Sequence, residues 1–230
     1  MKSDQEIQNA ARAIVSFTDS YIQYKQRKQN EQQESESTLS LAQVTSSLES
    51  VKEQIQYNNG CKQVICIPKL LQSLIALVTF RLGAHLNEQT DLLRLKVRYQ
   101  SRLCLWDIQR CGDEQDQSEL VNNGFGRVMS ISYCTAGGIG DEKDWEISNG
   151  LFHISEFLER LRYGRNDDLY PSFQPLPLLA RISLEQIEDE GANEEIEAQM
   201  NNKGLNGRIK MNATWAKSAT LNRFIHRGRT

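Results

Sequence analysis

Proline is scarce in this chain, with only 4 among 230 residues, and aromatic residues make up 7% of it. Apolar residues account for 39% and charged residues for 25%. This composition excludes a collagen-like chain, a wholly disordered chain and a continuous coiled coil. A chain of this length buries roughly 70–75% of its extended surface on folding, so a substantial core is expected.

Paired cysteine motifs are also missing. The five cysteines are an odd number and include no C-x-x-C spacing, which argues against a disulfide framework and against a zinc ribbon. The N-terminus has no apolar stretch of the kind found in secretion signals, and the most apolar run, 70–80, is shorter than the ~20 residues of a membrane span. We therefore expect reduced thiols, a cytoplasmic or nuclear location and no membrane partner.

Helical periodicity dominates the first half of the chain. Residues 4–24 predict an amphipathic helix, and the polar stretch 25–37 predicts a solvated extension or a linker. Residues 38–57 carry a three-four apolar seam, which favours one helix of an intramolecular bundle over a coiled coil because only two heptads are present. A central helix over 70–80 follows, and then a helix over 88–111 that Asn87 opens. This second helix is expected to have a solvated basic face that includes Arg94, Arg98 and Arg102.

Helical periodicity is less regular in the second half of the chain. Val128 to Cys134 alternates like a strand after a polar loop over 112–124, and 149–164 predicts a helix ended by Gly164. The proline-rich stretch 165–177 is expected to be extended, and the acidic segment after it weakly helical with a break at Gly191. The predicted fold is mainly α, a helical bundle with a small β or irregular insertion at about 124–148 and extended N- and C-terminal arms.

Three regions are expected along the chain. Residues 1–37 form an N-terminal helix and polar linker, residues 38–181 a helical core, and residues 182–230 an acidic segment followed by a basic tail. Helices 38–112 and 149–164 supply the core.

Charge is segregated along the chain. All 30 acidic residues lie at or before Glu197, so residues 1–198 carry a net charge of −10 and the remainder carries +7. Seven carboxylates between Glu185 and Glu197 directly precede the basic tail without an intervening Lys or Arg. The tail is therefore a separate electrostatic region.

The basic tail is the strongest candidate for a binding site. Lysine and arginine contact phosphates, and aromatic side chains stack on unpaired bases, so the combination suits single-stranded RNA or DNA. Thr214 could also cap a short helix over 215–226. The candidate nucleic-acid-binding residues are Lys203, Arg208, Lys210, Trp215, Lys217, Arg223, Phe224, Arg227 and Arg229.

Two other interpretations of the tail stay open. Its cations could pair with the acidic segment of the same molecule or of a neighbouring copy, which would set the register of an assembly. Alternatively, Trp215 and Phe224 close the bundle while the cations are simply solvated.

Two other segments suggest protein partners. Ile7, Ile14 and Tyr21 lie on one stripe of the first predicted helix, which could dock on a neighbouring copy. Tyr170 and Phe173 belong to an apolar stretch that could occupy a groove of another chain. A homo-oligomer or another protein is the expected partner.

Evidence for catalysis in the sequence is thin. Cys134 precedes a glycine-rich loop, but Gly140 is followed by acidic residues, which do not suit a phosphate-binding loop. A pair formed by Cys134 and His153 would lack a third orienting residue, and His85 and His226 lie far apart in the sequence. No ligand spacing predicts a metal, and no cofactor is expected.

These observations favour a non-enzymatic assembly protein that oligomerises through helical arms and binds nucleic acid through its basic tail, as a nucleoprotein or capsid-type subunit does. The alternatives are an interaction subunit of a larger complex with no nucleic-acid role and a cysteine-dependent enzyme that uses Cys134.

Overall fold

The computed structural model describes residues 4–27, 37–57, 61–134, 144–166 and 168–221. By their internal contacts these residues fall into two units, Met1–Gly112 and Asp113–Thr230. The division between Gly112 and Asp113 differs from the boundaries at residues 37 and 181 suggested by composition. Each unit has a buried core of its own.

The described residues of the first unit form five helices: α1 (Asp4–Arg27), α2 (Thr38–Tyr57), α3 (Cys61–Ile65), α4 (Leu70–Val78) and α5 (Glu88–Cys111). Helix α2 packs against α1 and α5, and α4 packs against the same two helices. The apolar seam of α2, from Leu41 to Ile55, is buried in these contacts. The expectation of a bundle within one chain is thus confirmed for this helix.

Aromatic side chains connect α1 to the end of α4. The ring of Phe80 lies 5.4 Å from that of Phe17 and 4.8 Å from that of Tyr21, and Phe80 is almost fully buried. Buried rings at such separations attract each other beyond the effect of their buried area. These rings, together with buried Ile7 and Ile14, hold α1 against the other helices of the first unit.

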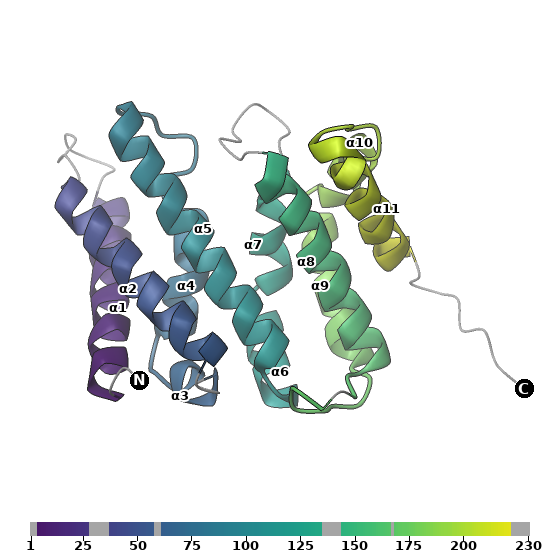
Figure 1. Ribbon diagram of the computed structural model, residues 1–230, viewed down its shortest axis with the longest axis horizontal. Helices are drawn as coiled ribbons and strands as arrows, with labels where there is room; N and C mark the ends of the chain where they lie inside the picture. Colours follow the sequence, from purple (N-terminus) through teal and green to yellow (C-terminus); the bar gives the residue numbers. More distant parts are fainter. Residues whose placement is uncertain (1–3, 28–36, 58–60, 135–143, 167, 222–230) are drawn as a thin grey trace, which may run out of the picture. The chain divides into compact units, whose positions relative to one another are not determined.

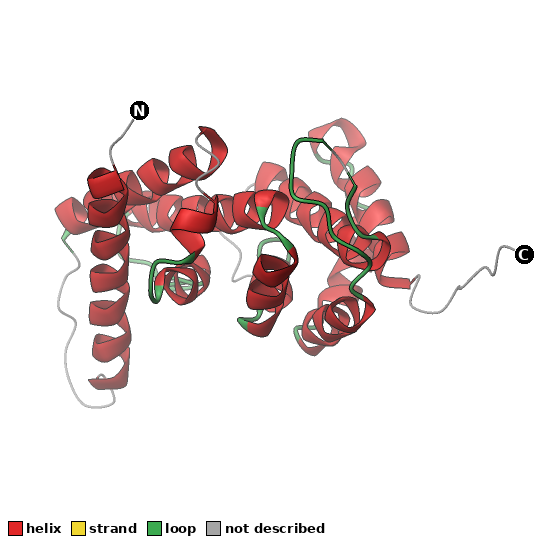
Figure 2. Cartoon of the chain, turned by 90° about the horizontal axis from the view of Figure 1, so that it is seen from below, coloured by secondary structure: helices red, strands yellow, loops and turns green. Residues whose placement is uncertain are grey.

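The second unit contains α6 (Glu114–Asn122), α7 (Phe125–Ile131), α8 (Asp144–Tyr163), α9 (Pro177–Asp189), α10 (Ala192–Gln199), a 3₁₀ turn η1 (Leu205–Gly207) and α11 (Arg208–Leu221). Helix α8 is central, because α7, α9 and α11 all pack against it. The rings of Phe125 and Phe157 meet edge to face at 4.6 Å in this core. Figure 2 shows helices and loops, but no strand, over the described residues.

Several predicted helix ends are confirmed. Asn87 caps α5 by accepting a 3.0 Å hydrogen bond from the backbone N–H of Thr90. Gly164 and Gly191 follow α8 and α9 in the left-handed conformation, with φ of 75° and 66°. At Gly164 a side chain would also collide with the backbone, since a Cβ there would lie 2.5 Å from the carbonyl oxygen of Phe173.

The predicted strand is wrong. Residues 125–131 form helix α7, in which Val128, Met129 and Ser130 are all buried. The hydroxyls of Ser130 and Ser132 donate to the carbonyls of Gly126 and Met129 within the same stretch. Alternation therefore does not divide a buried face from an exposed one here, and helix packing overrides β-propensity. The rest of the expected insertion, 135–143, lies outside the described residues.

The polar loop predicted over 112–124 also contains a helix. Asp113 starts α6 with a reciprocal capping box, in which its side chain accepts from the N–H of Asp116 and the Asp116 carboxylate accepts from the N–H of Asp113. This device satisfies two N–H groups that a helix start leaves open.

Neither predicted arm is extended in the described residues. Helix α1 packs on α2 and α4, and residues 208–221 form α11, which packs on α8 and α10. Thr214 lies inside α11, where its hydroxyl donates to the carbonyl of Lys210, so it does not cap a helix as expected. Residues 222–230 lie outside the described residues.

The basic face of α5 is not solvated as expected. Arg94, Arg98 and Arg102 are each at least 96% buried. Arg94 donates a 2.8 Å hydrogen bond to the carbonyl of Ala84, and Arg98 reaches the carbonyl of Phe80 at 3.4 Å. These guanidinium groups tie the segment between α4 and α5 onto α5.

Candidate nucleic-acid interface

The structure describes five of the nine tail residues singled out from the sequence: Lys203, Arg208, Lys210, Trp215 and Lys217. The other four, Arg223, Phe224, Arg227 and Arg229, lie outside the described residues. The described five are positioned by the turn η1 and by helix α11.

The turn between α10 and α11 determines where the basic helix begins. Leu205, Asn206 and Gly207 have φ of 51°, 55° and 82°, a left-handed run that reverses the chain directly before Arg208. Gly204, just before this turn, lies against the start of α8, since a Cβ there would be 2.5 Å from Asp144 Oδ2. A larger residue at this position would require the side chains of Asp144, Ile209 and Asn202 to move.

Small residues bring α11 close to α8. The buried face of α11 consists of Ile209, Ala213, Ala216 and Ala219. Between them, the side-chain amide of Asn212 donates to the carbonyl oxygen of Ser148 at 2.8 Å and to its Oγ at 3.0 Å. Both helices run in the same direction (Figure 1).

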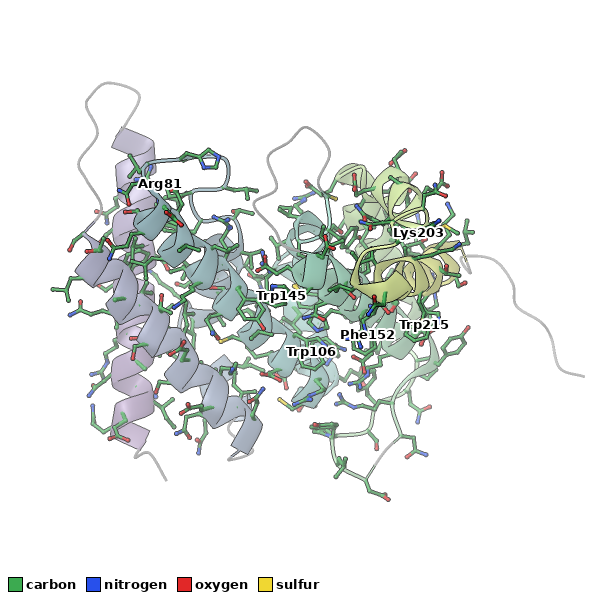
Figure 3. The ribbon with its side chains drawn as sticks, turned by 45° about the horizontal axis from the view of Figure 1, so that its top comes forward. Arg81, Trp106, Trp145, Phe152, Lys203 and Trp215 are labelled. Atoms are coloured by element: carbon green, nitrogen blue, oxygen red, sulfur yellow. The ribbon has the colours of Figure 1, made fainter. Side chains whose placement is uncertain are left out.

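The stripe of α11 that flanks this buried face is exposed. Arg208, Met211 and Trp215 follow one another at three- and four-residue steps, which places them on one stripe of the helix. Met211 is 45% and Trp215 46% exposed, and Arg208 and Lys210 are exposed as well. Figure 3 shows Trp215 and Lys203 on this helical unit. The stripe combines cations with an accessible aromatic ring.

Most of the described basic residues here are not neutralised by the acidic segment. Lys217 forms an ion pair with Glu197 of α10. Lys203, Arg208 and Lys210 form no ion pair with any residue that the structure describes. We call these three residues the α11 basic surface.

The acidic segment has other partners. Arg127 of α7 lies 2.9 Å from Glu190 and 3.5 Å from Asp189, and Arg181 lies 3.0 Å from Glu185. Pairing of the tail with its own acidic segment is therefore limited, in the described part of the chain, to Lys217.

Cys134 is poorly suited to nucleophilic chemistry. Burial, with the carboxylates of Glu195 and Glu190 adding to its effect, raises the pKa of the Cys134 thiol to about 12. A reactive cysteine needs the opposite shift, because the thiolate is the nucleophile. His153 is buried, and His85 is exposed with its Nδ1 3.7 Å from Asp91. Within the described residues, no three His, Cys, Asp or Glu side chains are grouped to hold a metal ion.

The proposed partner-binding residues all contact their own chain. Ile7 and Ile14 are buried in the first unit, and Tyr21 packs on Phe80. In the second unit the Arg165 guanidinium lies over both Tyr170 and Phe173, with its Cζ 5.7 Å and 4.8 Å from the two ring centres. Each of these five side chains is therefore engaged within its own chain.

Two residues that lie beside the α11 basic surface, Met211 and Phe152, were not predicted from the sequence. Met211 lies four residues before Trp215 and could have been found from that spacing once the helix was known to start at Arg208. Phe152 of α8 is half-buried next to α11 and carries no sequence signal that separates it from core residues.

In the described part of the chain, no helix is both long and apolar enough to cross a membrane. The chain matches no protein-family model, and neither the curated proteins nor the solved structures give a match.

Proposed function

We propose that this chain is a non-enzymatic nucleic-acid-binding protein whose α11 basic surface contacts the phosphate backbone of RNA or DNA. The observation that carries the proposal is the absence of described carboxylate partners for exposed Lys203, Arg208 and Lys210, although seven acidic residues lie just before them in the sequence. Unpaired cations of this kind release counterions from a nucleic acid when they bind it.

Two charge-reversal variants test the proposal. Arg208→Glu with Lys210→Glu removes two cations of the α11 basic surface, and Arg12→Glu with Lys96→Glu makes the same change in net charge at exposed positions of the first unit. Binding of a fluorescent single-stranded oligonucleotide is measured between about 50 and 200 mM salt. We expect steep weakening with salt, a loss of about tenfold or more in the first variant and a smaller loss in the second.

Equal losses in the two variants would show that only net charge matters and would reject the site. Removing residues 222–230 separates the contribution of the last nine residues from that of the α11 basic surface. We expect the shortened chain to retain salt-dependent binding that Arg208→Glu with Lys210→Glu still removes.

As a second candidate we propose an interaction subunit that binds a protein partner or a further copy of itself. Tyr163, Leu169 and Leu178 near the two ends of the proline-rich stretch are 70%, 82% and 68% exposed, which favours contact with another chain. Sedimentation velocity of the wild type and of Leu169→Ser with Leu178→Ser tests this function. If the wild type and the double variant both sediment as the same monomer, with and without oligonucleotide, that result would count against the interaction subunit.

A further inference from the structure

Helices α8 and α11 bring two aromatic side chains to the same level. The hydrogen bonds from Asn212 to Ser148 place these two residues at the same height on the two helices. From that point both helices run in the same direction. One helical turn further on are Phe152 of α8 and Trp215 of α11, since a turn takes about 3.6 residues. Figure 3 shows these two residues near each other on the second unit.

Trp215 differs from a tryptophan that stacks inside the protein. The ring of Trp106, in the first unit, lies under the guanidinium of Arg110 at 4.7 Å. Trp215 has neither a ring contact nor a hydrogen bond with any described residue, and nearly half of its surface is exposed. An accessible indole of this kind leaves a flat face and an N–H donor for a ligand.

The charges around this ring are favourable to a polyanion. Arg208 lies two turns before Trp215 on the same stripe, whereas Lys210, five residues before Trp215, is exposed about 140° round the helix from it. On the neighbouring helices, Glu197 pairs with Lys217, and Glu156 of α8 accepts a hydrogen bond from Arg160. Asp144 at the start of α8, Glu159 further along α8 and Glu194 of α10 are exposed carboxylates.

We infer that Trp215, bordered by Phe152, is a stacking platform for one unpaired base, so that the ligand of the α11 basic surface is single-stranded rather than double-stranded nucleic acid. This inference rests on the proposed function. Base stacking on an aromatic side chain tolerates any base sequence, because every base has a π-face. In a duplex the bases are stacked on one another, and only the phosphates could reach the cations.

Three probes separate stacking from charge: an oligothymidylate of about 15 nucleotides, a DNA duplex of the same length, and inorganic polyphosphate, which has no bases. The variant Trp215→Ala should bind oligothymidylate about 5- to 100-fold more weakly than the wild type, and should bind polyphosphate equally well. Trp215→Phe keeps an aromatic ring and should retain most of the affinity. Leu221→Ala, another exposed apolar residue of α11, serves as the matched control.

Tryptophan fluorescence gives a second readout. Stacking of thymine on Trp215 should quench part of the wild-type emission, and this part should be missing in Trp215→Phe. Equal binding of duplex and single strand by the wild type, or equal loss of oligothymidylate and polyphosphate in Trp215→Ala, would overturn the platform while leaving the proposed function in place. Failure of the wild type to bind any of the three probes would overturn both.

A protein ligand is the other possible occupant, and the same experiment tests for it. If Trp215→Ala abolishes self-association in sedimentation velocity without any effect on oligothymidylate binding, the surface is a protein interface and the platform is rejected.

Discussion

The side-chain amide of Asn212 donates to both the carbonyl oxygen and the hydroxyl of Ser148, 64 residues earlier in the chain. These bonds join α11 to α8 at a buried position. The acceptors would be left without this donor if Asn212 were replaced by an apolar residue. The pair therefore sets the register of the helix that carries the α11 basic surface.

Asn212→Ala should lower the free energy of unfolding by about 2 kcal/mol, because it leaves buried acceptors unsatisfied. Asn201→Ala, at an exposed position, should change it by less than about 0.5 kcal/mol. Urea denaturation followed by circular dichroism measures both. Equal stabilities of the two variants would mean that the bonds to Ser148 contribute nothing to the packing of α11.

Gly150 is required by the close approach of α7 to α8. A Cβ at this position would collide with the hydroxyl of Ser132, and it would also lie 3.2 Å from the ring carbon Cδ1 of Tyr133. Alanine in place of glycine within a helix normally stabilises by about 1 kcal/mol, so a net loss of stability in Gly150→Ala would come from the collision. Adding Ser132→Ala should recover part of the loss. If Gly150→Ala instead stabilises the protein, Ser132 and Tyr133 at the end of α7 can move away from the added methyl group without cost.

Arg165 closes the proline-rich loop that follows α8. Its Nε and Nη2 donate to the carbonyl of Pro171 at 2.8 and 2.6 Å, and its backbone pairs with that of Phe173. Arg165→Lys keeps the charge but not the forked donor geometry. We expect faster proteolysis between residues 164 and 176 in this variant, followed by mass spectrometry of the fragments. Arg181→Lys, an exposed arginine in α9, is the control and should not change the cleavage rate.

Asp107 should make the first unit less stable as the pH rises. Burial raises the pKa of its carboxyl from 3.8 to about 6, although Arg110 lies 3.2 Å away and Gln56 donates to it at 2.8 Å. Because the folded pKa exceeds the unfolded one, the folded state holds more protons between about pH 4 and pH 6, and stability falls by about 3 kcal/mol as the pH rises through this range.

Asp107→Asn removes this titration. The difference in unfolding free energy between wild type and variant, measured in urea at several pH values, should therefore change across this range and be constant above it. A difference independent of pH would contradict the raised pKa of Asp107.

The ion pair between Lys217 and Glu197 should weaken polyanion binding. Glu197→Gln removes a carboxylate next to α11 and frees the ammonium group of Lys217. We expect tighter binding of single-stranded oligonucleotide and a salt dependence that steepens by about 0.7 in the logarithmic slope, the contribution of one further phosphate contact. Glu185→Gln, whose partner is Arg181, is the matched control. Weaker binding in Glu197→Gln would argue that the pair positions α11 and does not mask a cation.

The fold class and most helices could be predicted from the sequence because their apolar residues recur at helical spacing. The buried seam of α2 and the cap at Asn87 are examples. The failures occurred where burial is decided by distant contacts. The alternating stretch that starts at Val128 lies largely in the buried helix α7, which ends at Ile131. Arg94 and Arg98 of α5 donate to carbonyls of the segment that covers them, and periodicity within one helix does not reveal this contact.

The candidate surface was only partly predictable. Charge counts identified Lys203, Arg208 and Lys210, since segregation of charge is visible in a linear sequence. Pairing of Lys217 with Glu197 depends on the path of the chain through η1, and the position of Phe152 beside α11 depends on helix packing. Neither can be read from spacing in the sequence.

The turn Leu205–Gly207 sends the chain back so that α11 packs alongside α10, the helix of opposite charge. Glu197 of α10 pairs with Lys217, well beyond Arg208 at the start of the basic helix. The acidic helix therefore lies along one flank of α11 and not beyond its end. A bound strand would be repelled on that flank, so this short reversal of the backbone decides which side of the basic helix a nucleic acid can occupy.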